Sequence, residues 1–226
     1  QCLDLRANNW TIIMNQLAEK YNIAYPELKS EKFHESCTIV EPQNNGTEKF
    51  QEIVLTGWDG ILFPHELARK TSSFPSIAKH TSVLNLDCDG IVIFEKNGEK
   101  YILFCELKSS FIWEDITHAK DQLIGSSVKL KGLLNTLQGF NTNDYKYIGL
   151  IVSFEPTQEQ LTNISKNDNA GAAFAISLNS QKHYFMPADK CDKYYYPLAA
   201  GQFDIYYISV PNRQTTISVN VNSFLK

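Results

Sequence analysis

The chain has 226 residues, of which 43% are hydrophobic and 20% are charged. This length and composition are those of a globular protein with a sizeable core, and they exclude an intrinsically disordered chain. No apolar run approaches the roughly 18 residues that a transmembrane helix needs, so we expect no membrane contact. The formal net charge is −4, whereas proteins that coat nucleic acid are usually basic, so any nucleic-acid contact must come from a local patch. Five cysteines without a Cys-x-x-Cys pair favour a reducing compartment and predict a cytoplasmic protein.

The first part of the chain predicts one helix and two strands before residue 64. Apolar side chains recur at helical spacing over residues 10–21. Strands are expected near residues 37–40 and over residues 50–55, where apolar and polar side chains alternate. A short helix is expected over residues 64–70, because proline is favoured in the first turn of a helix.

Two β-rich runs, Gly90–Lys96 and Glu99–Leu107, are joined by Asn97-Gly98. This dipeptide between alternating apolar residues is the strongest short-range signal for a hairpin with a two-residue turn. The turn fixes the register, so that residue numbers in a facing pair sum to 195. The expected pairs are Lys96 with Glu99, Glu95 with Lys100, Ile93 with Ile102, Ile91 with Phe104 and, on the other face, Phe94 with Leu103 and Val92 with Cys105.

Charged residues meet at the far end of this predicted hairpin. There Asp89 falls opposite Glu106 and Asp87 falls opposite Lys108, all on one face because side chains repeat every two residues along a strand. Facing Cβ atoms lie about 5 Å apart, and two carboxylates at that distance repel unless a proton or cation lies between them. Mg²⁺ is bound by one or two carboxylates together with water and substrate phosphate. The alternative is an ordinary Asp87–Lys108 ion pair beside two solvated carboxylates.

The chain after the hairpin predicts a parallel crossover. Residues 113–137 have the spacing of a long helix, with a polar stripe at His118, Gln122 and Lys129, and residues 147–154 form an apolar strand. A strand, a helix and a further strand indicate parallel pairing through a right-handed crossover. A loop is expected over residues 167–171, followed by strands over residues 173–178, 203–210 and 216–221. The pattern predicts one α/β domain over residues 1–226, with a central mixed sheet flanked by helices.

Asp89-Gly90 precedes an apolar strand, Glu106-Leu107-Lys108 lies on the next strand, and Gln122 lies on the following helix. The order of these residues resembles the pattern of the PD-(D/E)xK nuclease superfamily. The match covers approximately residues 82–154, and the proline of the family pattern is absent. The resemblance implies a restriction-endonuclease-like core in which Asp89, Glu106 and the Leu107 carbonyl hold Mg²⁺ or Mn²⁺ and Lys108 is catalytic. It also implies a supporting role for Gln122, for which a solvated helix stripe is the alternative.

Members of this superfamily often carry a further acid on a helix before the hairpin. Glu66 is the nearest candidate and Glu19 lies behind it, although either is equally explained as a solvated surface acid. For phosphate contacts the candidates are Lys120, Lys129 and Lys131, which simple exposure would also explain.

The resulting hypothesis is a divalent-metal-dependent nuclease with DNA as the favoured substrate. An RNase or a structure-specific resolvase, and a non-catalytic nucleic-acid or partner-binding module with the same fold, remain as alternatives. A homo-oligomer is compatible with the sequence.

Overall fold

The computed structural model describes residues 2–41, 52–63, 86–186, 203–211 and 214–225. The predicted helix over residues 64–70, which contains Glu66, lies outside these ranges. The elements are α1 (Cys2–Ala24), β1 (Glu31–Phe33), β2 (Ser36–Val40), β3 (Glu52–Thr56), β4 (Gly60–Phe63), β5 (Gly90–Lys96), β6 (Glu99–Lys108), α3 (Trp113–Leu134), a 3₁₀ turn (Thr142–Asp144), β7 (Lys146–Phe154), α4 (Gln158–Ser165), α5 (Ala170–Gln181), β8 (His183–Met186), β9 (Phe203–Val210), β10 (Thr216–Asn220) and a 3₁₀ turn (Val221–Ser223).

Within the described residues, seven strands form a mixed sheet in the order β1-β4-β5-β6-β7-β9-β8, and three form a second sheet in the order β10-β3-β2. The predicted parallel crossover is confirmed, because β7 pairs parallel to β6 after α3, and β9 pairs parallel to β7. The α/β class with a central mixed sheet flanked by helices is therefore confirmed.

The β5–β6 hairpin has the register that its turn predicts. Pairing runs from Lys96 with Glu99 to Gly90 with Cys105, and both turn residues have positive φ, as a type I′ turn requires. Two expected pairs were wrong: Val92 faces Leu103 and Phe94 faces Tyr101. The residues expected there are diagonal neighbours, because a regular antiparallel ladder moves one residue forward on one strand for each residue back on the other.

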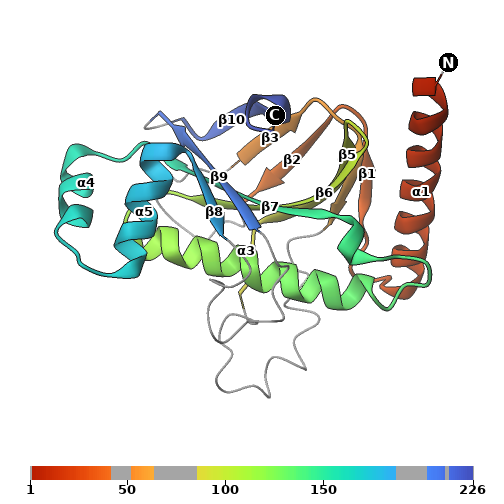
Figure 1. Cartoon of the computed structure of the whole chain (residues 1–226), viewed down its shortest axis with the longest axis horizontal. Helices are drawn as coiled ribbons and strands as arrows, with labels where there is room; N and C mark the ends of the chain where they lie inside the picture. Colours follow the sequence, from red (N-terminus) through yellow and green to blue (C-terminus); the bar gives the residue numbers. More distant parts are fainter. Residues whose placement is uncertain (1, 42–51, 64–85, 187–202, 212–213, 226) are drawn as a thin grey trace.

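The large sheet is covered on both faces (Figure 1). Alternate residues of its strands pack against α1, α3 and α5, as Ile91 and Phe104 do. The intervening residues, such as Val92 and Leu103, pack against the small sheet. Burial on both faces explains why β5 and β6 read as nearly continuous apolar runs.

The predicted strand over residues 173–178 was wrong, because these residues belong to α5. The Asn169 side chain accepts a hydrogen bond from the Ala172 N–H at 2.8 Å and caps that helix. Ala172, Ala175 and Leu178 are buried at a helical spacing of three residues. The alanine content and the cap therefore outweigh the apolar character that suggested a strand.

Among the described residues, no helix is both long enough and apolar enough to cross a membrane. Cys37, Cys88 and Cys105 are buried and are not disulfide-bonded. Cys88 and Cys105 therefore act as small apolar side chains of the two cores.

Candidate active site

The acidic end of the hairpin lies beneath α3, on the helix-covered face of the large sheet. Glu106 continues the alternation of Ile102 and Phe104, which pack against the helices, and its side chain is 2% exposed. Asp89 immediately precedes β5, and its Oδ2 accepts a hydrogen bond from the Leu107 backbone N–H at 2.7 Å. The structure thus brings Asp89, Glu106 and the Leu107 backbone together at the position that the register predicts.

Lys108 is held by two side chains. Its Nζ donates to Glu106 Oε1 at 2.6 Å and to Gln122 Oε1 at 2.7 Å. Gln122 also donates from Nε2 to the Asp87 carbonyl oxygen at 2.7 Å, so its amide orientation is fixed at both ends. Gln122 therefore bridges the lysine and the chain entering β5, and the alternative of a solvated glutamine is excluded by these contacts.

Both carboxyl groups of the site resist ionisation. Burial raises the pKa of Asp89 to about 7, against the lowering effects of the Leu107 N–H and the Lys108 ammonium. The pKa of Glu106 lies well above its ordinary value, first because of burial and then because of the negative charge of Asp89, although Lys108 opposes both. Closely spaced buried carboxyls of this kind favour a proton or a cation between them.

Residues of α3 hold the segment that leads into β5. The Ser126 hydroxyl accepts a hydrogen bond from the Cys88 N–H at 2.8 Å. Lys129 Nζ lies 2.7 Å from Asp87 Oδ1 and also donates to the Leu86 carbonyl oxygen. With Gln122, these residues make a polar stripe that fixes residues 86–88 against the helix, and we call it the α3 clamp.

Two expectations are corrected by the α3 clamp. Asp87 pairs with Lys129, whereas Lys108 pairs with Glu106, so the expected facing of Asp87 and Lys108, and the ion pair given as the alternative, are replaced by two separate pairs. The Lys129 side chain is 7% exposed, so its ammonium binds protein groups and is not available to a substrate phosphate.

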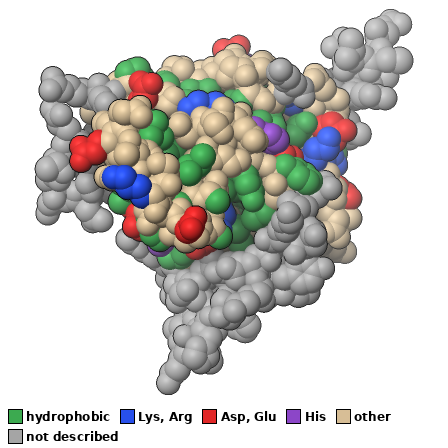
Figure 2. Space-filling model, turned by 60° about the vertical axis from the view of Figure 1, so that its left-hand side comes forward, with side chains coloured by type: hydrophobic (Ala, Val, Ile, Leu, Met, Phe, Trp, Pro, Cys, Tyr) green, Lys and Arg blue, Asp and Glu red, His purple; other side chains and the backbone are tan. Residues whose placement is uncertain are grey.

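The other two lysines are less buried, but they also have protein neighbours. Lys120 Nζ lies 3.7 Å from Asp121 Oδ1 and 5.5 Å from the centre of the Phe174 ring, and Lys131 Nζ lies 6.0 Å from that of Tyr147. Figure 2 shows basic, acidic and apolar side chains interspersed on one face, without a continuous basic surface over the part drawn in colour. These surroundings do not single out either lysine as a phosphate contact.

The sequence missed a third acid near the site, Glu41. Its negative charge raises the pKa of both Asp89 and Glu106, which places it within electrostatic range of the pair. Glu41 follows β2 and continues the inward alternation of Cys37 and Ile39, and this period of two is the signal that could have found it. Of the two acids proposed instead, Glu19 is exposed on α1 and Glu66 lies outside the described residues.

The donor set fits a hard divalent cation. Within the described ranges, Glu106 Oε2 is a buried oxygen without a hydrogen-bond partner, beside the crowded Asp89 carboxyl. In the same part of the chain, no three His, Cys, Asp or Glu residues are arranged as a metal-binding group. Two carboxylates suffice for Mg²⁺, which keeps several waters and takes further oxygens from substrate phosphate.

Comparison with known proteins adds no relative: no family model matches the chain, and no curated protein or solved structure matches it significantly.

Proposed function

We propose that the chain is a divalent-metal-dependent nuclease that hydrolyses phosphodiester bonds, with DNA as the favoured substrate and Mg²⁺ or Mn²⁺ as the cofactor. The observation that carries the proposal is the buried pair Asp89 and Glu106, with a Glu106 oxygen that has no hydrogen-bond partner among the described residues and a lysine fixed beside it. Burying such a pair costs stability, and a catalytic role explains why the fold retains it. The resemblance to PD-(D/E)xK nucleases supports the same conclusion.

Each residue has a separate role in this proposal. Asp89 and Glu106 would hold the cation, together with the Leu107 carbonyl that the resemblance implies. A bound divalent cation supplies a lowered pKa for water and offsets negative charge on phosphate oxygens. Lys108 would stabilise the negative charge that develops on the attacked phosphate, and Gln122 would keep the ammonium in place.

A cleavage assay tests the proposal directly. The substrates are plasmid DNA, linear duplex, single-stranded DNA and RNA, each incubated with Mg²⁺, Mn²⁺ or EDTA. We expect cleavage of DNA only with a divalent cation, and a loss of at least about 100-fold in Glu106→Gln and Lys108→Met, as for loss of electrostatic stabilisation in other enzymes. The matched control is Glu159→Gln, an exposed acid on α4. Equal cleavage in EDTA, or in both site variants, would contradict the mechanism.

The same experiment separates the alternatives. Preferential cleavage of RNA, or of branched DNA added to the panel, would assign an RNase or a resolvase. Binding without cleavage under every metal condition would assign a non-catalytic binding module.

A further inference from the structure

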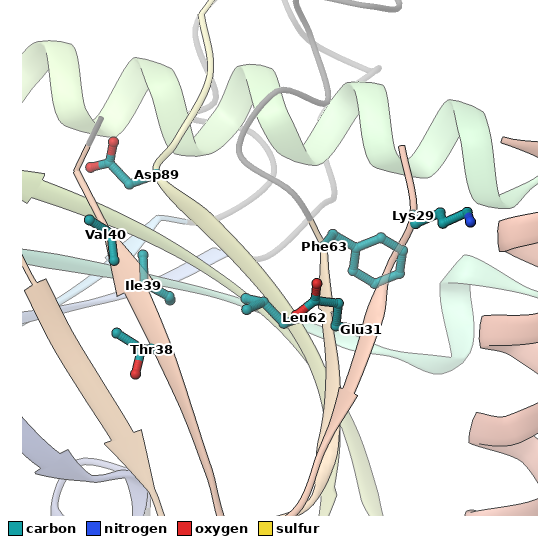
Figure 3. A pocket seen from close by; sticks show the side chains of 8 residues that line it. All are labelled: Lys29, Glu31, Thr38, Ile39, Val40, Leu62, Phe63 and Asp89. Atoms are coloured by element: carbon teal, nitrogen blue, oxygen red, sulfur yellow. The ribbon is translucent and has the colours of Figure 1, made fainter. Parts of the chain in front are cut away.

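A pocket of about 240 Å³ opens beside the candidate active site (Figure 3). Asp89 lies at one end of the pocket, and Lys29 lies beyond Phe63 at the other end in this view. Val40 on β2 forms one wall, and Leu62 and Phe63 on β4 form the opposite wall. Asp89 belongs to the carboxylate pair and also lines the pocket. A group bound in this pocket therefore lies next to a ligand bound at the carboxylate pair.

Among the described lining residues, Ile39, Val40, Leu62 and Phe63 are apolar, and Glu31, Thr38 and Asp89 carry hydrogen-bond acceptors. Glu31 pairs with Leu62 across the β1–β4 ladder, and its carboxylate lies beside Leu62 in Figure 3. Val40 is 48% exposed, a large fraction for an aliphatic side chain next to a cluster of charges. Apolar walls with a small number of polar groups are the usual form of a pocket that binds a small ring system, and the polar groups fix the orientation of the ring.

We propose that this pocket holds one unpaired nucleobase next to the scissile phosphate, with Glu31 accepting a hydrogen bond from the base's amino group. This inference rests on the proposed nuclease function and deepens it. Carboxylates accept from amino groups such as N4 of cytosine, a donor that thymine and uracil lack. Lys29 at the far end supplies a positive charge for the next phosphate of the strand.

The size of the pocket excludes a stacked base pair. Its volume is below the roughly 300–1,000 Å³ of sites that enclose drug-sized ligands, so it accommodates a single ring system. A duplex must therefore release one base to fill the pocket, which costs unstacking and unpairing, whereas a single strand or a frayed end bears much less of this cost. The expected substrate is DNA with unpaired bases at the cut position.

The test uses a single-stranded oligonucleotide that contains one 2-aminopurine. This base carries an amino group, and its fluorescence is quenched when it stacks on neighbouring bases. Binding is followed with Ca²⁺ in place of Mg²⁺, and cleavage of single strands and matched duplexes is followed with Mg²⁺. The variants are Val40→Trp, which fills the pocket, and Glu31→Gln, which weakens the acceptor and adds a competing donor. Their controls are Ile176→Trp, at an exposed apolar position on α5, and Glu159→Gln.

We expect wild-type protein to increase the 2-aminopurine fluorescence and to cut single strands at least about tenfold faster than duplexes, as the cost of unpairing predicts. Val40→Trp should abolish the fluorescence increase and the preference for single strands, and Ile176→Trp should retain both. Glu31→Gln should reduce the preference for cuts beside adenine, cytosine or guanine over thymine by about tenfold, the effect of weakening one charged hydrogen bond.

Metal-dependent cleavage that is equal for both substrates and unchanged by Val40→Trp and Glu31→Gln would overturn the pocket assignment and leave the nuclease function standing. Absence of both binding and cleavage for every nucleic acid would overturn both. If Val40→Trp does not fold, the base preference of Glu31→Gln alone decides the pocket assignment.

Discussion

The raised pKa of Asp89 is a direct consequence of its burial, to which the negative charge of Glu41 adds. An acid whose folded pKa exceeds its unfolded value is ionised earlier in the unfolded chain, so unfolding becomes easier as the pH rises between those two values. For Asp89 the interval runs from the ordinary value of 3.8 to about 7. The metal-free protein therefore loses stability across this interval, at about 1.4 kcal/mol for each unit of pKa difference.

Asp89→Asn should remove this loss. The amide oxygen can still accept the Leu107 N–H, so in EDTA the variant should unfold at higher urea than wild type at pH 8, with a smaller difference at pH 4. The expected increase in unfolding free energy at pH 8 is on the order of a few kcal/mol, with the pKa difference of Asp89 as its upper bound. Asp168→Asn, at an exposed position before α5, is the control. If the variant is less stable than wild type at pH 8, the buried Asp89 carboxylate does not destabilise the metal-free protein.

When metal is present, Asp89→Asn should lower the stability of the protein relative to wild type. Mg²⁺ or Mn²⁺ should raise the melting temperature of wild type, because a ligand that binds only the folded state stabilises it by RT ln(1 + [L]/Kd). Asp89→Asn should lose most of that increase, while Asp168→Asn should keep it. Equal shifts in wild type and Asp89→Asn would place the metal elsewhere on the chain.

Gln122 acts through Lys108, so its substitution should separate positioning from metal binding. Gln122→Leu removes the acceptor for Lys108 Nζ and the donor to the Asp87 carbonyl. We expect a fall of about tenfold or more in cleavage rate, because a misplaced ammonium loses part of its stabilisation of the transition state. The metal-induced rise in melting temperature should persist. A Gln122→Leu enzyme with full activity would remove Gln122 from the site.

At the scale of secondary-structure elements, α3 does more than cover the sheet. The α3 clamp (Gln122, Ser126 and Lys129) fixes the segment before β5 and so aims Asp89 at Leu107. The spacings of four and three residues put the three side chains on one helix face. The stripe is visible in the sequence, but its contacts are with a segment about 40 residues away and depend on how the helix docks.

The Lys129–Asp87 pair tests the clamp. Its side chains are 7% and 19% exposed, so removing one partner leaves a poorly solvated charge on the other. Lys129→Met should cost about 2–4 kcal/mol of unfolding free energy, and adding Asp87→Asn should recover part of it. Urea unfolding of the two single variants and the double variant measures the coupling. Strict additivity would mean that the pair does not hold the segment.

At the scale of the whole molecule, the two sheets approach each other closely at Gly90. A Cβ atom at this position would lie 2.7 Å from three side-chain carbons of Ile39 on β2. The missing side chain lets the small sheet approach the start of β5, and this approach brings Glu41 near Asp89. A side chain at this position would therefore push against β2, the strand that precedes Glu41.

Gly90→Ala should destabilise the protein by about 1–3 kcal/mol, the usual cost of overpacking a core. Combining it with Ile39→Ala, which removes the clashing carbons, should relieve the steric part while adding the cost of lost burial, so the two changes should couple favourably. Gly132→Ala on α3, where a Cβ meets nothing within 4 Å, is the control and should be neutral or stabilising. If both glycine variants have the same stability in urea unfolding, the close approach at Gly90 is not needed.

Short-range sequence patterns determined the β5–β6 hairpin, α3 and the pairing of β7 with β6. Asn97-Gly98 alone set the β5–β6 register, because Asn-Gly favours a type I′ turn, which has positive φ at both positions and joins the strands with two residues. Helical periodicity located α3, and the strand–helix–strand order gave the parallel β6–β7 pairing. These features depend on neighbours within a few residues or on general rules of chain connection, so one sequence suffices to predict them.

Only the tertiary structure decided which charges meet. Asp87 pairs with Lys129 and not Lys108. Glu41, which follows a strand of the small sheet, raises the pKa of Glu106 through its negative charge. Such contacts follow from how α3 and β2 dock on the large sheet, and docking depends on the summed packing of many side chains. A residue pattern gives the face on which a charge lies, but its partner is fixed by the element that covers that face.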